Sequence, residues 1–315
     1  MDISASNQKL IDTVESARGF YLLHAPRGSG KSTRMQRLKE QLIAKGFACF
    51  DVDLQSVDLD ANSTIDGFWK EFASALSSYN LYPSSAPISS AATFRTWLSD
   101  PTNFIFKTAS VPETPKVVLI IDEFDKLYQA SQAVKDGFLG ALRSLRQEPG
   151  CLWAVLGVGP YSILTLTSET STPFTATEAI QISSFTKEEV FQLFTEFAAS
   201  RLITLPNELI EDIYERTAGH AGLVCYCGKM IEKTIDEGWQ NKLNHYEAWL
   251  AYAPKLPVDL ITAPNGLSTM AKLVSCMDNP DVREFVVKYF LHGDQPVLQD
   301  ANNAQMLAYL TAEGV

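Results

Sequence analysis

Residues 1–184 alternate between short apolar runs and stretches whose apolar residues recur every three or four positions. The run Val117 to Ile121 has five branched apolar residues and no polar one, which predicts a strand buried on both faces, as in a parallel sheet. Other apolar runs predict strands at 19–24, 47–52, 151–158 and 179–182. Helical spacing predicts a helix from Lys31 onward and further helices that include 64–79 and 132–147. This alternation predicts a three-layer α/β core.

From Thr186 onward the pattern becomes helical. The sequence Thr-Lys-Glu-Glu at 186–189 is a capping box, and it precedes apolar residues at helical spacing. Two further helices are predicted near 207–217 and 221–236, and prolines at 254, 257 and 264 indicate a boundary. We therefore expect an α/β core at 1–184, a helical lid at 185–253 and a helical unit at 254–315. The last unit would be the front of a winged-helix-like domain cut short, so the chain would be a fragment of a longer protein.

Composition narrows the class of protein. The chain has 315 residues, 46% of them hydrophobic, and its formal net charge is −11. This acidity argues against a nucleic-acid binder held by its overall field, although a local basic patch stays an alternative. The N-terminus lacks the pattern of a secretory signal, no apolar run is long enough for a membrane helix, and the five cysteines are scattered. These features predict an intracellular protein, cytoplasmic or nuclear, without a disulfide framework, a zinc site or a membrane partner.

The stretch from Tyr21 to Arg34 carries the first candidate chemistry. A predicted strand is followed by His-Ala-Pro-Arg-Gly-Ser-Gly-Lys-Ser-Thr and then by a predicted helix, which is the context of a phosphate-binding loop. Glycines let successive N–H groups curl round an anion, and the helix N-terminus favours negative charge. Alanine stands at position 25, where the G-x-x-x-x-G-K-[ST] pattern has its first glycine. The predicted nucleotide-binding residues are Pro26, Arg27, Gly28, Ser29, Gly30, Lys31, Ser32 and Thr33.

A second candidate motif follows the buried run at 117–121, where the sequence continues Asp122-Glu123-Phe124-Asp125. Ligands of open α/β sheets bind at the carboxyl ends of the strands, so this acidic pair and the glycine loop should converge. Lys31 would reach the β- and γ-phosphates, while Ser32 and Asp122 would hold Mg²⁺, Asp122 through water. Glu123 would orient and deprotonate the attacking water. The alternative is a strand end with solvated acids.

Other polar residues carry open alternatives. Asp51 and Asp53 end the predicted second strand, where they would either touch a water near the nucleotide or simply be solvated. Either of Arg143 and Arg146, on a predicted helix, could approach the nucleotide, and so could Arg216 or His220 near a turn. The alternative for each is a purely structural role. The strand at 151–158 offers only Tyr161 and Ser162 as sensor candidates.

These motifs together resemble a P-loop ATPase of the AAA+/STAND type. Over about residues 5 to 250, the chain is similar to the ATPase module of Crinkler-type effectors. The resemblance rests on the glycine loop and on Leu119 to Asp125, with weaker support from Phe68-Trp69, Pro173-Phe174, Phe185 to Val190 and Thr217 to Val224. It implies a five-stranded parallel sheet in the order 5-1-4-3-2 and, in longer relatives, a winged helix followed by a nuclease-like domain. Such an effector would act in the host-cell nucleus.

The leading hypothesis is Mg²⁺-dependent ATP hydrolysis, with Lys31 and Glu123 as catalytic residues, in a regulatory module of a larger Crinkler-like effector. ATP and ADP are then its ligands, and the oligomeric state is left open. One alternative is a nucleotide-gated interaction module that hydrolyses little ATP. Another is a DNA-associated ATPase.

Overall fold

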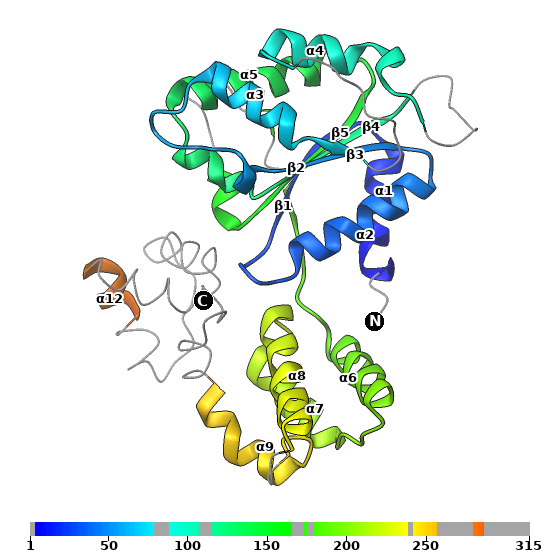
Figure 1. Ribbon diagram of the computed structural model, residues 1–315, viewed down its shortest axis with the longest axis vertical. Helices are drawn as coiled ribbons and strands as arrows, with labels where there is room; N and C mark the ends of the chain where they lie inside the picture. Colours follow the sequence, from blue (N-terminus) through cyan, green and yellow to red (C-terminus); the bar gives the residue numbers. More distant parts are fainter. Residues whose placement is uncertain are drawn as a thin grey trace. The chain divides into compact units, whose positions relative to one another are not determined.

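The computed structural model describes residues 4–78, 88–106, 115–165, 173–174, 179–238, 242–256 and 280–286. The chain divides into two compact units, and each is described by itself (Figure 1). The α/β unit contains Asp2–Ala25 and Lys31–Ile182, and the helical unit contains Pro26–Gly30 with Ser183–Val315. None of the helices in the described ranges combines the length and apolar character that a membrane crossing requires.

A mixed sheet of six strands forms the centre of the α/β unit, in the order β3-β2-β4-β5-β1-β6. The strands are β1 (Gly19–His24), β2 (Ala48–Asp53), β3 (Ser77–Ser78), β4 (Val117–Asp122), β5 (Leu152–Gly159) and β6 (Ala179–Gln181). All neighbouring pairs except β2 with β3 are parallel. The carboxyl ends of β1, β2, β4, β5 and β6 therefore share one edge of the sheet.

The sixth strand corrects the expectation of five strands, all parallel. Ser77 and Ser78 form β3, which pairs antiparallel with Asp51 and Phe50 of β2. The helix expected at 64–79 is accordingly shorter, because α3 spans Ile65–Ala75. A polar strand of two residues has no apolar alternation, so the pattern of side chains could not reveal it. Its extended conformation depends on the pairing with β2.

Helices cover both faces of the sheet (Figure 1). Apolar residues of α1 (Ser4–Ser16) and α2 (Lys31–Ala44) pack in one cluster, and those of α3, α4 (Ala91–Ser99) and α5 (Gln132–Gln147) pack in another. Alternate residues of β1 contribute to both clusters: Leu23 packs with α1 and α2, and Leu22 packs with α3, α4 and α5. Short 3-10 helices follow several strands: η1 (Leu54–Ser56), η3 (Phe124–Gln129) and η4 (Tyr161–Thr165), with η2 (Pro101–Asn103) after α4. This is a three-layer α/β arrangement.

The helical unit has its own core. Its elements are α6 (Lys187–Arg201), α7 (Asn207–Thr217), α8 (Ala221–Asp236), α9 (Tyr246–Tyr252), η6 (Ala253–Lys255) and α12 (Pro280–Val286). The predicted capping box is present: the Thr186 hydroxyl accepts from the Glu189 amide, and the Glu189 carboxylate accepts from the Thr186 amide. Trp249 is fully buried in the cluster that joins α6, α7, α8 and α9.

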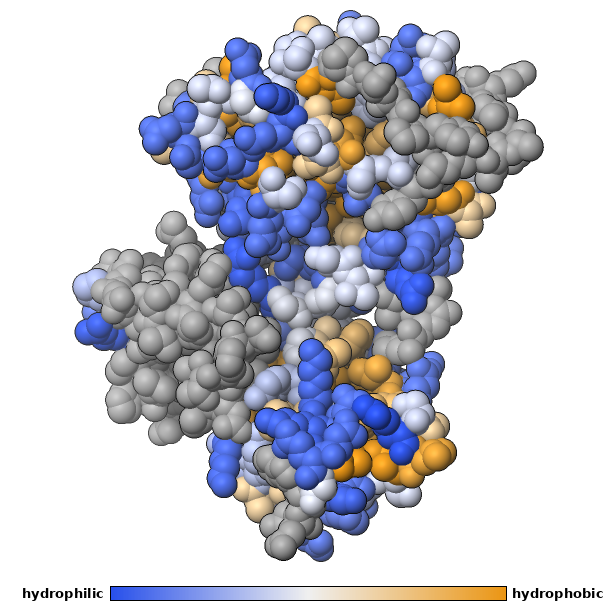
Figure 2. Space-filling view, in the orientation of Figure 1, coloured by the Kyte–Doolittle hydropathy of each residue, from blue (hydrophilic) through white to orange (hydrophobic). Residues whose placement is uncertain are grey.

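The predicted unit at 254–315 falls mostly outside the described residues, which include only 254–256 and α12 of it. Its winged-helix character and the division at 184 and 253 stay predictions. Figure 2 shows hydrophilic residues over much of the visible face of both units. The large apolar side chains that the structure describes as exposed come from four separate segments: Ile105, Tyr128, Leu202 and Leu250.

Gly219, in the described part of the helical unit, approaches a neighbouring backbone very closely, which gives a testable prediction. Its φ is +70°, and a Cβ on this residue would lie 2.0 Å from the carbonyl oxygen of Phe185. Gly219→Ala is therefore expected to destabilise the protein by about 2–4 kcal/mol, measured by urea unfolding. The matched control is Gly238→Ala, because Gly238 has φ +67° but nothing within 4 Å of its Cβ position. Equal losses of stability in both variants would contradict this account.

Candidate functional site

The loop between β1 and α2 is a tight turn that requires glycine at two positions. Gly28 and Gly30 have φ angles of +70° and +80°, in the left-handed region that disfavours side chains. The Ser29 amide donates to the Pro26 carbonyl oxygen at 3.3 Å, which closes the turn. Ala25 does not adopt a positive φ and is buried. Alanine in place of the first glycine of the pattern therefore causes no backbone strain.

The loop leads directly into the first turn of α2. Lys31 is the first residue of this helix, and its buried side chain donates from Nζ to the carbonyl oxygen of Ala25 at 3.1 Å. Ser32 and Thr33 are exposed on the same turn. Unpaired N–H groups and the helix dipole make such an N-terminus favourable for an anion. The start of α2 is therefore suited to an anion such as a phosphate.

The acidic pair of the second motif lies at the end of β4. Asp122 is the last residue of the strand, and its Oδ1 accepts a hydrogen bond from the Glu123 amide at 2.9 Å. Glu123 has φ 50° and ψ 43°, a left-handed conformation that is uncommon for a residue with a side chain. Residues held in such sparsely populated conformations cluster at functional sites. The strained turn directs the chain away from the sheet immediately after Asp122.

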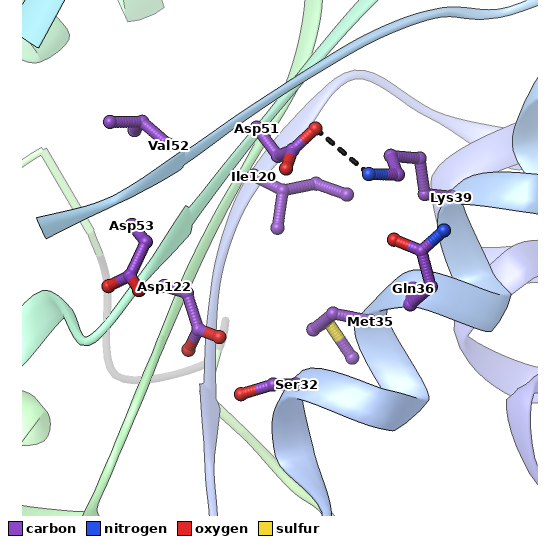
Figure 3. A pocket seen from close by; sticks show the side chains of 9 residues that line it. All are labelled: Ser32, Met35, Gln36, Lys39, Asp51, Val52, Asp53, Ile120 and Asp122. Atoms are coloured by element: carbon purple, nitrogen blue, oxygen red, sulfur yellow. Dashed lines mark hydrogen bonds and ion pairs between the residues drawn. The ribbon is translucent and has the colours of Figure 1, made fainter. Parts of the chain in front are cut away.

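A pocket of about 170 Å³ lies in the α/β unit between α2 and the ends of β2 and β4 (Figure 3). The Ser32 hydroxyl and the Asp122 carboxylate point toward each other across it, and Asp53 lies beside Asp122. The pocket is lined by Ser32, Met35, Gln36, Lys39, Asp51, Val52, Asp53, Ile120 and Asp122. The fold thus brings two residues of the predicted metal site to one cavity, although they are 90 positions apart in the sequence.

An ion pair forms the inner wall of this pocket. Lys39 Nζ lies 2.9 Å from Asp51 Oδ1, and the lysine side chain is only 3% exposed (Figure 3). The sequence analysis did not identify Lys39 or Gln36. They follow Ser32 by seven and four positions, and this spacing places all three on one face of α2. Helical periodicity from Ser32 could therefore have found them.

Burial keeps two titratable side chains next to these elements neutral. It lowers the pKa of His24, the last residue of β1, and raises the pKa of Cys49 in β2 to about 12. Neither adds charge at pH 7. The charge around the pocket is therefore determined by its lysine and its three aspartates.

The arginines considered for the nucleotide have structural contacts. Arg146 donates to the Pro173 carbonyl oxygen at 2.6 Å, and its guanidinium lies 5.9 Å from the Phe20 ring centroid. Arg216 pairs with Asp212, with 2.6 Å between Nε and Oδ2. Arg143 is exposed on α5. These contacts favour structural roles for Arg146 and Arg216.

His220 contacts the glycine loop, which belongs to the same compact unit. Its Nδ1 accepts from the Leu223 amide at 3.4 Å and caps α8, so Nε2 carries the proton. Nε2 lies 2.9 Å from the Arg27 carbonyl oxygen and donates to it. Of the sensor candidates, Ser162 is half-buried, and its carbonyl oxygen accepts from the Tyr128 hydroxyl at 2.8 Å.

The part of the chain that carries this geometry is similar to a known protein family. Residues 14–166 match a family model described as an AAA domain. Over this segment, the chain is similar to an AAA domain. The matched segment includes the glycine loop, the acidic pair and every residue that lines the pocket.

Two solved structures are similar in fold to this chain. A Walker-type ATPase of Pyrococcus abyssi is similar with a TM-score of 0.61 and 13% identity, over 99% of this chain and 89% of that one. Cdc6p from Pyrobaculum aerophilum is similar with a TM-score of 0.52 and 12% identity, over 98% and 88%. At such low identity, the likeness establishes the α/β P-loop fold alone. A comparison with curated protein sequences finds no match.

Proposed function

We propose that residues 14–166 form an AAA domain that binds ATP with Mg²⁺ and hydrolyses the bond between its β- and γ-phosphates. One observation carries this proposal: Ser32, on the first turn after the glycine loop, and Asp122, at the end of β4, line the same pocket. A helix N-terminus that carries a hydroxyl, with a carboxylate close to it, is the arrangement that a Mg²⁺–triphosphate complex needs.

The oxygen donors at this pocket fit Mg²⁺. Ser32 offers a hydroxyl and Asp122 a carboxylate, and Mg²⁺ prefers such hard ligands. The described residues contain no group of three or more His, Cys, Asp or Glu side chains arranged to hold a metal by themselves. This suits Mg²⁺, because the ion usually takes one or two protein ligands and completes its shell with waters and substrate phosphates. When bound, the ion would neutralise charge on the phosphates.

The remaining predicted residues have distinct roles in this proposal. Lys31 binds the phosphate oxygens and stabilises the charge that develops on them during transfer. Glu123 orients a water and accepts its proton as the water attacks the γ-phosphorus, and ADP leaves with the bond electrons. The backbone of the loop cradles the phosphates, with contributions from Pro26, Arg27, Gly28, Ser29, Gly30 and Thr33.

Calorimetric titration of the purified chain with ATP, ADP and GTP tests the binding step. Micromolar affinity corresponds to about −8 kcal/mol and is readily measured. A phosphate-release assay with Mg²⁺, and with EDTA in its place, tests the chemical step. We expect ATP binding and Mg²⁺-dependent release of phosphate. A chain that binds none of the three nucleotides would overturn the proposal.

A nucleotide-gated interaction module is the second candidate. It is favoured by the internal contacts of Arg146 and Arg216, because an arginine committed to a structural contact is less available to stabilise phosphate transfer. Tight binding of ATP or ADP without phosphate release, together with a nucleotide-dependent change in protease sensitivity, would select this function.

The resemblance to Crinkler-type modules supports a narrower proposal. In it, the ATPase regulates a nuclease-like domain of a longer protein that acts in a host-cell nucleus. A full-length transcript that ends at Val315 would contradict this role. A DNA-associated ATPase is distinguished by duplex DNA that stimulates phosphate release, an effect that should weaken as salt rises.

A further inference from the structure

Two carboxylates end neighbouring parallel strands on the same side of the sheet. Asp53 of β2 and Asp122 of β4 are direct partners in the strand register. Partnered residues of parallel strands direct their side chains to the same face. Both side chains line the pocket that Ser32 also lines, and Figure 3 shows them next to each other. Asp53 therefore belongs to the surroundings of the proposed metal site.

The charges in this pocket do not balance. It is lined by three aspartates and one lysine, and that lysine, Lys39, pairs with Asp51. Asp53 and Asp122 each accept one backbone hydrogen bond, from the amides of Gln55 and Glu123. Neither forms an ion pair with any residue in the described ranges. Two negative charges thus line the pocket that Ser32 also lines, which is the charge that one divalent cation would neutralise.

The pocket also has room for the water shell of the cation. Its volume is about 170 Å³, and a liquid water takes about 30 Å³, so several waters fit beside an ion. Bound Mg²⁺ usually retains several waters, and residues that hydrogen-bond to such outer positions tune the affinity for the metal. Lys39 engages Asp51 on the inner wall, which leaves Asp53 as the second carboxylate directed to this space.

We propose that Asp53 is a positioning residue for Mg²⁺, acting as the acceptor of a hydrogen bond from a metal-bound water. This inference rests on the proposed function, because the ion arrives with ATP. Ser32 and Asp122 hold the metal, and Asp53 orients its hydration shell from β2. The Lys39–Asp51 ion pair joins α2 to β2 and so maintains the alignment of Asp53 with Ser32.

The test separates binding of the metal from binding of the nucleotide. A non-hydrolysable ATP analogue is titrated into the full chain by calorimetry, first in EDTA and then at stepped Mg²⁺ concentrations. We expect Asp53→Asn to reduce the Mg²⁺-dependent gain in analogue affinity about 10-fold, within the range for outer-shell partners of metals. The affinity in EDTA should stay within about twofold of the original chain. Mn²⁺ resonance spectra provide a direct readout of metal binding in the same variants.

Asparagine can still accept the hydrogen bond from the Gln55 amide, so this variant should fold. Asp53→Ser provides a second variant that keeps a capping oxygen without the carboxylate. The matched control is Asp58→Asn, which makes the same charge change at an exposed residue that does not line the pocket. If Asp53→Asn and Asp58→Asn show the same Mg²⁺ dependence as the original chain, the role of Asp53 is wrong and the ATPase proposal stands. If the original chain binds no nucleotide, both proposals are wrong.

Discussion

Glu123→Gln is expected to retain ATP but to release phosphate about 10²–10⁴-fold more slowly than the original chain. The glutamine is nearly isosteric, so the loop, Lys31 and the pocket should be unchanged. It cannot accept the proton of the attacking water, and the loss of a general base typically costs this range in rate. Single-turnover phosphate release with saturating Mg²⁺ and ATP measures the effect on the chemical step.

Glu148→Gln is the matched control for this variant. Glu148 is exposed at the end of α5 and does not line the pocket, so the same chemical change there should leave turnover within about twofold. Calorimetry establishes whether each variant still binds ATP. Unchanged turnover in Glu123→Gln would show that another group activates the water.

Lys31→Ala is expected to weaken ATP binding about 100-fold or more and to abolish measurable hydrolysis. Truncating one member of a desolvated charge pair costs about 2–5 kcal/mol, and each 1.4 kcal/mol is about tenfold in affinity. Lys31 is only 8% exposed, so water competes little for its ammonium group. Its hydrogen bond to the Ala25 carbonyl oxygen holds the side chain in place before a phosphate arrives. Calorimetric titration with ATP measures the loss.

Lys45→Ala removes a lysine just after the other end of α2, where Lys45 pairs with Glu15 at 2.9 Å on the surface. An exposed pair of this kind contributes about 0–1 kcal/mol, so stability and ATP affinity should change little. If Lys31→Ala binds ATP as tightly as Lys45→Ala does, the glycine loop is not the phosphate site. Thermal unfolding of both variants shows whether Lys31→Ala changes only ATP binding or also destabilises the fold.

Lys31 and Glu123 belong to two separate parts of the candidate site. The glycine loop comes from one continuous stretch of chain, whereas the acidic pair comes from a strand almost a hundred residues later. Glu123 directly follows β4, and Lys31 begins the helix after the loop that follows β1. An open sheet places such connections along one edge, so residues that are distant in sequence can act on one ligand.

Local signals in the sequence were enough to predict most elements of this protein and to indicate its candidate chemistry. Five strands, the glycine turn and the helical character after Thr186 are encoded in the spacing of apolar residues and in turn residues, which are local signals. The two motifs are local signals as well. Each is a short run whose residue types match one chemical task.

The way in which these elements combine around the pocket depends on contacts between distant parts of the chain. The polar strand β3 exists through its pairing with β2. The place of Asp53 beside Asp122 depends on the strand register, and the Lys39–Asp51 ion pair depends on how α2 packs on the sheet. Such contacts join residues that are far apart in the chain, and their geometry results from packing the whole core rather than from any local pattern. Alanine fits at position 25 because the folded loop does not require a positive φ there.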